Sequence, residues 1–213
     1  MKKRYWAFLI GSWCLSVGMQ AAKVDTLSVH SDAMNKEVQV ITICPDKAMA
    51  GEKCPVLYLL HGYGGNAGTW LGIKPELPQI ADKEGIIFVC PDGKNSWYWD
   101  SPLNKEYRYE TFVSKELVNY IDKNFTTKVE RGGRAITGLS MGGHGSLWLS
   151  IRHKDVFGGG GSMSGGLDIR PFPNNWEMKK QLGEEASNKQ RWDEHTVINQ
   201  LDKIKNGDLA VII

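Results

Sequence analysis

Runs of apolar residues separated by short polar turns recur along the chain and predict alternating strands and helices. Alternating apolar and polar positions in 36–44 indicate a half-buried strand, and 23–30 is expected to pair with it as an edge strand. Continuously apolar runs at 55–60 and 85–90 are typical of strands covered on both faces, as in a parallel sheet. A further buried strand is expected to begin at Leu209.

Between these strands the apolar spacing changes to that of helices. Helices are predicted around 76–84 and over 109–125, where Val113, Leu117, Tyr120 and Ile121 share one face that we interpret as core. The charged residues of that helix, Glu116 and Asp122 among them, are interpreted as its solvated face. Strands joined through crossover helices predict an α/β fold with a mostly parallel central sheet.

The last third of the chain is less regular. The segment 157–163 is predicted to be a glycine-rich strand, which allows a neighbouring helix to pack closely. The polar stretch 167–206 is expected to form a helical excursion beside the sheet, with its best helix over 195–204.

The first 22 residues form a separate unit. A basic start at Lys2, Lys3 and Arg4, an apolar run and small residues at Ala21 and Ala22 are the layout of a secretory signal peptide, so export to the periplasm or medium is expected. A membrane anchor fits less well because the run is short and interrupted. A lipoprotein modified at Cys14 also fits poorly, since Trp13 precedes the cysteine.

Composition adds few constraints beyond a single globular domain over 23–213. The formal net charge of the 213 residues is +2, and without the basic start the remainder is close to neutral. No nucleic-acid surface or polybasic membrane patch is therefore expected.

Three cysteines remain after the first 22 residues. Cys44 and Cys54 flank a connection between two strands, so in an exported protein they form either a disulfide or two buried thiols. Cys90 lies in an apolar run and is expected to be a buried free thiol. The spacing suggests no metal site.

The stretch that carries chemistry is Gly138-Leu139-Ser140-Met141-Gly142, between the strand at 135–137 and a helix predicted over 146–152. A serine at a tight strand-to-helix turn, with glycine two residues before and after it, is typical of a nucleophile elbow. The Met141 N–H, at a helix N-terminus, is suited to bind an oxyanion.

A second motif lies at the end of the strand expected beside the elbow strand. His61-Gly62-Tyr63-Gly64-Gly65 is a flexible loop that brings backbone N–H groups close to a ligand. We assign the second oxyanion donor to the N–H of Tyr63, with Gly62 as the alternative. A serine and two oxyanion donors together indicate acyl transfer.

Four segments together resemble the esterase D family of α/β-hydrolases: VLYLLHGYGGN, PDGKNSWYWDSP, YETFVSKELVNYID and ITGLSMGGHGSLWL. That family includes S-formylglutathione hydrolases, feruloyl and acetyl-xylan esterases, tributyrin esterases and mycolyltransferases. The resemblance implies a three-layer sandwich, Ser140 as nucleophile, and Tyr63 and Met141 at the oxyanion-hole positions. Trp97 and Tyr98 would line the substrate cleft or pack under its loop, and no metal or organic cofactor is implied.

The chain departs from the family in its catalytic triad. In that family the acid follows the strand that this chain only begins at Leu209, and the histidine follows the strand after that one, so a domain that is incomplete at its C-terminus is expected. Among the residues present, His144 is expected on a helix face and His61 is expected to orient the oxyanion loop. Asp168 or Asp193 with His195 preserves the chain order and is retained as a less favoured alternative.

The sequence thus predicts an exported serine esterase acting on short or carbohydrate-linked acyl esters, such as acetyl or feruloyl esters. A non-catalytic remnant or binding protein, and an acyltransferase of the same fold, are the alternatives. The partner is expected to be a small-molecule or carbohydrate-linked ester, and the oligomeric state is left open.

Overall fold

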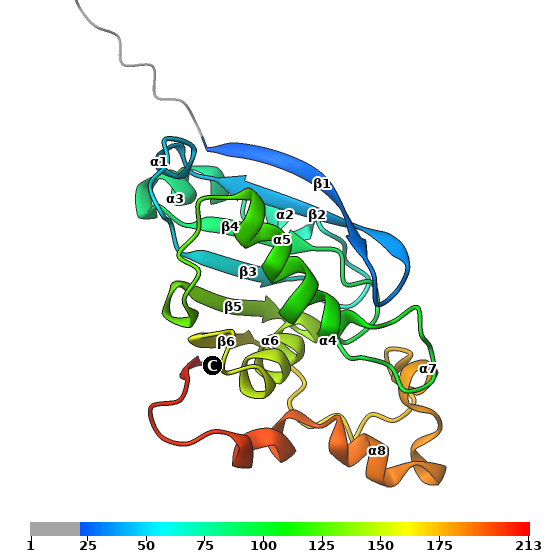
Figure 1. The fold of residues 1–213 in the computed structure, drawn as a ribbon. Helices are drawn as coiled ribbons and strands as arrows, with labels where there is room; N and C mark the ends of the chain where they lie inside the picture. Colours follow the sequence, from blue (N-terminus) through cyan, green and yellow to red (C-terminus); the bar gives the residue numbers. More distant parts are fainter. Residues whose placement is uncertain (1–21) are drawn as a thin grey trace, which may run out of the picture.

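The computed structural model describes residues 22–213, which form one seven-stranded sheet with helices on both faces (Figure 1). The strand order is β1-β2-β4-β3-β5-β6-β7. Only the pairs β1–β2 and β2–β4 are antiparallel, so the predicted α/β fold with a mostly parallel sheet is confirmed. The strands are β1 (Lys23–Ser31), β2 (Lys36–Cys44), β3 (Val56–Leu60), β4 (Ile87–Pro91), β5 (Arg134–Leu139), β6 (Gly159–Met163) and β7 (Ala210–Ile212). The predicted signal peptide lies outside the described residues except for Ala22.

In Figure 1, α4, α5 and α6 lie across one face of the sheet, whereas α2 and α3 lie behind it. The short helices α7 and α8 belong to the predicted excursion; α8 lies beyond the β6 side of the sheet, whereas α7 lies past the carboxyl ends of the strands (Figure 1). The α-helices are α1 (Asp46–Met49), α2 (Thr69–Ile73), α3 (Leu77–Glu84), α4 (Tyr109–Thr111), α5 (Leu117–Asn124), α6 (Met141–Arg152), α7 (Met178–Leu182) and α8 (Lys189–Glu194). A π-helix, Phe112–Glu116, joins α4 to α5, and 3-10 helices span Arg131–Gly133, Glu185–Ser187 and Val197–Lys203.

The central strands are apolar throughout because alternate side chains enter two different cores. Tyr58 and Leu60 of β3 pack with α5 and α6, whereas Leu59 between them packs with Trp70 of α2 and Leu77 of α3. Successive side chains of a strand point to opposite faces of its sheet, so each face receives half of each apolar run. The same division explains the continuous run in β4.

The glycine-rich strand β6 brings α6 close to the sheet, as predicted. A Cβ at Gly160 would lie 2.1 Å from Ser150 Oγ of α6. Cys44, Cys54 and Cys90 are buried free thiols, so of the two states expected for Cys44 and Cys54 the structure has the unpaired one.

Four expectations are corrected. Glu116 and Asp122 are not a solvated face: Glu116 accepts hydrogen bonds from Ser31 Oγ and the Ala33 N–H, and Asp122 pairs with Arg134 at 2.6 Å. Over 195–204 the chain forms a 3-10 helix, not an α-helix. The long helix 109–125 contains the π-helical segment. Finally, β7 is exposed, because it lies at the edge of the sheet, and Ile212 is 76% exposed.

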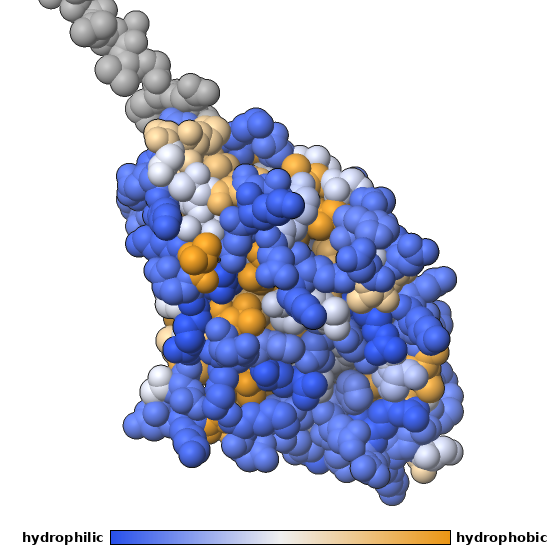
Figure 2. Space-filling model, viewed as in Figure 1, coloured by the Kyte–Doolittle hydropathy of each residue, from blue (hydrophilic) through white to orange (hydrophobic). Residues whose placement is uncertain are grey.

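The surface seen in Figure 2 is mostly hydrophilic, with apolar residues in small separate patches. Within residues 22–213, no helix is both long and apolar enough to cross a bilayer.

Candidate active site

Ser140 occupies the turn between β5 and α6 with a backbone conformation that serine rarely adopts. Its φ is 55° and its ψ is −115°, in a region costly for a residue with a Cβ. The turn is held by two backbone hydrogen bonds: the Ser140 N–H donates to Met163 O at 2.8 Å, and the His144 N–H donates to Ser140 O at 3.0 Å. The side chain of Ser140 is exposed, so its hydroxyl can be reached from solvent.

The two glycines of the elbow are there because no side chain fits. A Cβ at Gly138 would lie 2.3 Å from the carbonyl carbon of Gly142, and one at Gly142 would lie 2.2 Å from Leu60 O. These distances are far inside van der Waals contact with backbone that cannot move aside. The sequence-based expectation of a turn that admits only glycine is confirmed.

The HGYGG loop lies directly beside the elbow. Strands β3 and β5 are parallel neighbours and Leu60 pairs with Gly138, so both strands deliver their loops to the same edge of the sheet. A Cβ at Gly62 would lie 3.5 Å from Ser140 Cβ. Met141 begins α6, so its N–H has no acceptor within the helix. Tyr63 follows Gly62, and its side chain is partly exposed.

The buried ring of His61 holds this loop in place through hydrogen bonds. Its Nδ1 donates to Gly62 O at 2.7 Å, and its Nε2 accepts a hydrogen bond from the Gly93 N–H at 2.9 Å. Both ring nitrogens are thus used, and the ring joins the oxyanion loop to the loop after β4. This geometry agrees with the expectation that His61 orients the loop.

Trp97 and Tyr98 lie in the loop after β4, both with positive φ, at 57° and 61°. The Tyr98 side chain is fully buried and donates from its hydroxyl to His61 O at 3.1 Å, so it supports the site from below. Trp97 stacks on Trp99 with ring centroids 5.6 Å apart and reaches Trp176 at 6.0 Å. Trp97 is thus the one of the pair that adjoins the exposed aromatic residues of the excursion.

His144 is buried in α6 and does not serve Ser140. Its Nδ1 donates to Gly166 O at 2.7 Å, and its Nε2 accepts from Trp99 Nε1 at 2.9 Å. Burial lowers the pKa of His144 to about 4, so the ring is neutral at pH 7. The expectation of a structural residue on the helix is confirmed.

The alternative built on His195 is wrong. His195 Nδ1 donates to Arg191 O at 2.7 Å, and its ring stacks on Trp148 with centroids 5.4 Å apart. Asp168 and Asp193 instead form ion pairs with Arg170, at 2.8 Å and 3.0 Å.

The other two histidines pair with Glu37 and Glu110, so within residues 22–213 no histidine hydrogen-bonds to Ser140.

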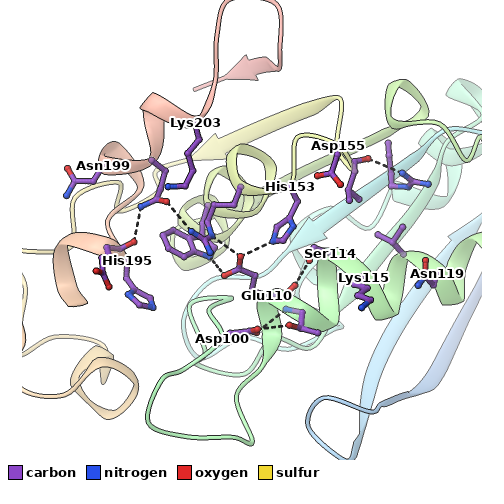
Figure 3. A pocket seen from close by; sticks show the side chains of 18 of the residues that line it. Asp100, Glu110, Ser114, Lys115, Asn119, His153, Asp155, His195, Asn199 and Lys203 are labelled. Carbon is purple, nitrogen blue, oxygen red and sulfur yellow. Dashed lines mark hydrogen bonds and ion pairs between the residues drawn. The ribbon is translucent and has the colours of Figure 1, made fainter. Parts of the chain in front are cut away.

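A cavity of about 1050 Å³ lies away from this site. It lies between α4–α5, the end of α6 and the segment around α8, and none of its lining residues belongs to the elbow or the HGYGG loop (Figure 3). At its centre Glu110 accepts hydrogen bonds from Trp148, Arg152 and His153. Across the described part of the chain, no three His, Cys, Asp or Glu residues gather as a metal site.

Comparison with known proteins places residues 31–212 within the family model named Esterase. The chain is 29% identical over 151 residues to an acetyl esterase of Caldicellulosiruptor saccharolyticus, covering 67% of this chain and 56% of that protein. It is 34% identical over 155 residues to the diacylglycerol acyltransferase/mycolyltransferase Ag85A of Mycobacterium leprae, covering 68% and 44%. A solved ferulic acid esterase matches with a TM-score of 0.68 at 27% identity, covering 88% of this chain and 74% of the other. The chain therefore spans about half the length of these two curated relatives.

Proposed function

The chain belongs to the Esterase family, and on that premise we propose that it is the nucleophile-bearing part of a serine esterase that hydrolyses carboxylic esters through an acyl group carried on Ser140. The observation that carries the proposal is the exposed Ser140 at a glycine-bounded elbow with the HGYGG loop against it. The names of the acetyl esterase and ferulic acid esterase relatives support acetyl and aromatic acyl esters as substrates.

In the proposed mechanism, Ser140 Oγ attacks the ester carbonyl carbon. The oxygen that becomes negative accepts hydrogen bonds from the N–H groups of Tyr63 and Met141, and the N-terminus of α6 adds the favourable end of its dipole. Collapse of the tetrahedral intermediate breaks the ester C–O bond, and the alcohol leaves with the proton that Ser140 gave up. Water then attacks the acyl carbon on Ser140 and releases the carboxylic acid and the free serine. The base that takes the serine proton is not one of the described histidines, which are all committed elsewhere.

Exposed aromatic side chains support an apolar or aromatic acyl group. Phe172 and Trp176 are each 43% exposed, their ring centroids lie 5.4 Å apart, and Trp176 adjoins Trp97. In this proposal Phe172 and Trp176 border the acyl side of the cleft, whereas the buried Trp97 packs beneath Trp176 and Tyr98 fixes the loop that carries Trp97. The proposal includes export, supported by the composition of residues 1–22, and no metal or organic cofactor.

Two other functions have an observation in their favour. The similarity to Ag85A supports acyl transfer to an acceptor other than water, which product analysis distinguishes from hydrolysis. The absence of a histidine beside Ser140 in residues 22–213 supports a binding protein without turnover.

The test is labelling by a fluorophosphonate probe followed by peptide mapping. We expect slow labelling of Ser140 in the 213-residue chain and faster labelling once the chain is extended with the C-terminal segment of a relative, which supplies a base. Ser140→Ala should abolish labelling, whereas Ser164→Ala, a matched change at an exposed serine close to the elbow, should not. Undiminished labelling of the Ser140→Ala protein would reject the proposal.

A further inference from the structure

A small cleft opens beside Gly64 and Gly65 of the HGYGG loop. Its volume is about 270 Å³, below the roughly 300–1000 Å³ of pockets that enclose a whole ligand, so it suits one part of a larger molecule. Gly64 and Gly65 form one wall, and the others come from the loop after β4 and from α7. The remaining lining residues are Lys94, Asn95, Tyr107, Glu177, Lys180 and Gln181.

The cleft lies within reach of the reacting serine. Gly64 is two residues beyond Gly62, whose Cα faces Ser140 closely enough that a Cβ there would lie 3.5 Å from Ser140 Cβ. Tyr63, the proposed oxyanion donor, lies between Gly62 and Gly64. A group bound in the cleft can therefore be part of the same molecule as a carbonyl held at Ser140.

The residue that points to a ligand is Gln181. Its side chain is 5% exposed, and its amide Oε1 is buried without a hydrogen-bond partner. A buried polar group left unpaired is costly, and an apolar side chain of the same size would avoid that cost. Only the backbone of Gln181 has a structural task, since its carbonyl accepts from Ser101 Oγ at 2.9 Å. The polarity of this side chain is thus not explained by folding.

The amide selects a particular kind of group. The unpaired Oε1 of Gln181 is an acceptor, so it needs a donor. A hydroxyl donates a hydrogen bond without bringing a charge, whereas a carboxylate has no donor to offer.

The charges at the cleft do not call for an ionic ligand. Lys94 pairs with Asp92 at 2.7 Å, and Lys180 pairs with Glu177. Each cation is thus matched by an anion of its own, so the cleft has no excess charge to attract an ion.

The walls of the cleft are preassembled. Glu177 pairs with Lys180, which lowers the pKa of its carboxyl group. Asn95 Oδ1 accepts from the Gly64 N–H at 2.9 Å. This last bond joins the loop after β4 to the oxyanion loop, so little ordering of that wall is needed when a ligand enters.

We propose that this cleft is the subsite for the alcohol part of the ester, and that Gln181 selects a neutral, hydroxyl-bearing group such as a sugar ring. The assignment rests on the proposed function for its link to catalysis. The binding of the hydroxyl-bearing group itself needs no turnover.

The test is an amide NMR titration of the 213-residue chain with methyl β-xylopyranoside, and separately with cyclohexanol as a ring with one hydroxyl. We expect the sugar to shift the Gln181 side-chain amide and the Gly64 and Gly65 backbone amides, and cyclohexanol to shift them much less. Gln181→Met should weaken sugar binding about tenfold, the equivalent of one hydrogen bond of about 1.4 kcal/mol. Gln190→Met, the same change on the exposed surface of α8, should leave it unchanged.

Equal shifts with both probes, shifts confined to another surface, or undiminished sugar binding by the Gln181→Met protein would overturn the assignment. The spectrum of each variant reports its folding directly, and the wild-type titration decides even if a variant unfolds. Failure of Ser140 labelling together with Gln181-dependent sugar binding would remove the esterase proposal and keep the subsite. Successful labelling without sugar binding would do the reverse.

Discussion

Ser140 keeps a positive φ because the packing and hydrogen bonds of the residues around it fix its backbone. A conformation of this kind costs about 1–3 kcal/mol and persists only where the surroundings fix it. Here Gly138 and Gly142 touch backbone on either side, and the Ser140 N–H is bonded to Met163 O. The exposed hydroxyl is thus a product of close packing at two glycines.

Adding one methyl group at the elbow should therefore disrupt it. Gly142→Ala would place a Cβ 2.2 Å from Leu60 O, and we expect a loss of at least 1–3 kcal/mol in the free energy of unfolding. Urea unfolding measures this change in the free energy of unfolding. Gly72→Ala, also in a helix but with nothing within 4 Å of its added Cβ, is the control and should be neutral or stabilising. Equal effects of the two changes would contradict the packing argument.

The buried His144 should make the protein sensitive to mild acid. Its pKa of about 4 in the folded state lies below the roughly 6.5 of an unfolded chain, so between these values only the unfolded state gains the proton. The free energy of unfolding should fall by up to about 3 kcal/mol as the pH drops from about 6.5 to about 4. Burial also lowers the pKa of His195, which adds to the same slope.

Urea midpoints at pH 7 and pH 5 test this. His144→Asn should be less stable at pH 7, since Trp99 Nε1 loses its acceptor, and should lose less stability on acidification than wild type. Gly72→Ala, which removes no titratable group and has nothing within 4 Å of its added Cβ, should keep the wild-type slope. An unchanged slope in the His144 variant would show that other groups govern the acid response.

At this scale, the sequence identified Ser140 and its glycines because the elbow is a local motif. It could not show that Tyr98 is buried and bonded to His61 O, because that contact joins positions 37 residues apart. The sequence also could not show that the side-chain amide oxygen of Gln181 is buried without a partner, since a single glutamine in a polar stretch carries no such signal. Such features depend on which distant segments the fold brings together.

At the scale of elements, Glu110 holds α4 against α6. Its carboxylate accepts hydrogen bonds of 2.9 Å from Trp148 Nε1, 2.8 Å from Arg152 Nε and 2.8 Å from His153 Nε2 (Figure 3). Helix α6 carries Ser140 at its other end. The position of the elbow helix relative to α4 thus depends on one buried carboxylate.

Neutralising that carboxylate should loosen the pair of helices. Glu110→Gln leaves Arg152 without its anion, and we expect a loss of about 2 kcal/mol or more in the free energy of unfolding by urea titration. Glu84→Gln breaks an exposed pair with Lys83 and should cost well under 1 kcal/mol. A Glu110 variant no less stable than the Glu84 variant would show that the network does not hold α6.

The strands could be predicted closely because each is a short apolar run bounded by turn residues. The 3-10 helix at Val197–Lys203 could not, since its polar residues carry no clear period. Nor could the exposure of β7, whose apolar sequence matches that of the buried strands. An apolar run predicts that a strand forms. The place of that strand in the sheet depends on which distant strands pair with it.

At the scale of the molecule, β7 presents an open edge with apolar side chains. Val211 is 43% exposed and Ile212 is 76% exposed, and such an edge readily pairs with another chain. We expect residues 23–213, expressed alone, to associate as concentration rises, and Ile212→Lys to reduce the association in sedimentation velocity. The opposite edge offers a control: Val24→Lys on β1 should change association less. Monomeric wild type at high concentration would contradict the expectation.

The order of the strands also bears on how quickly the molecule folds. Val56 of β3 pairs with Arg134 of β5, about 78 residues later in the chain, so a long loop must close before the centre of the sheet exists. Chains rich in such distant pairings fold slowly, because the entropy of closure is lost before the contacts repay it. The HGYGG loop and Ser140 lie at the ends of these two strands, so the chemical site forms only when the slowest pairing is complete. On the ribosome, a chain whose first 133 residues have emerged can pair β3 with β4 but still lacks β5 and Ser140, so the site can form only in the later stages of synthesis.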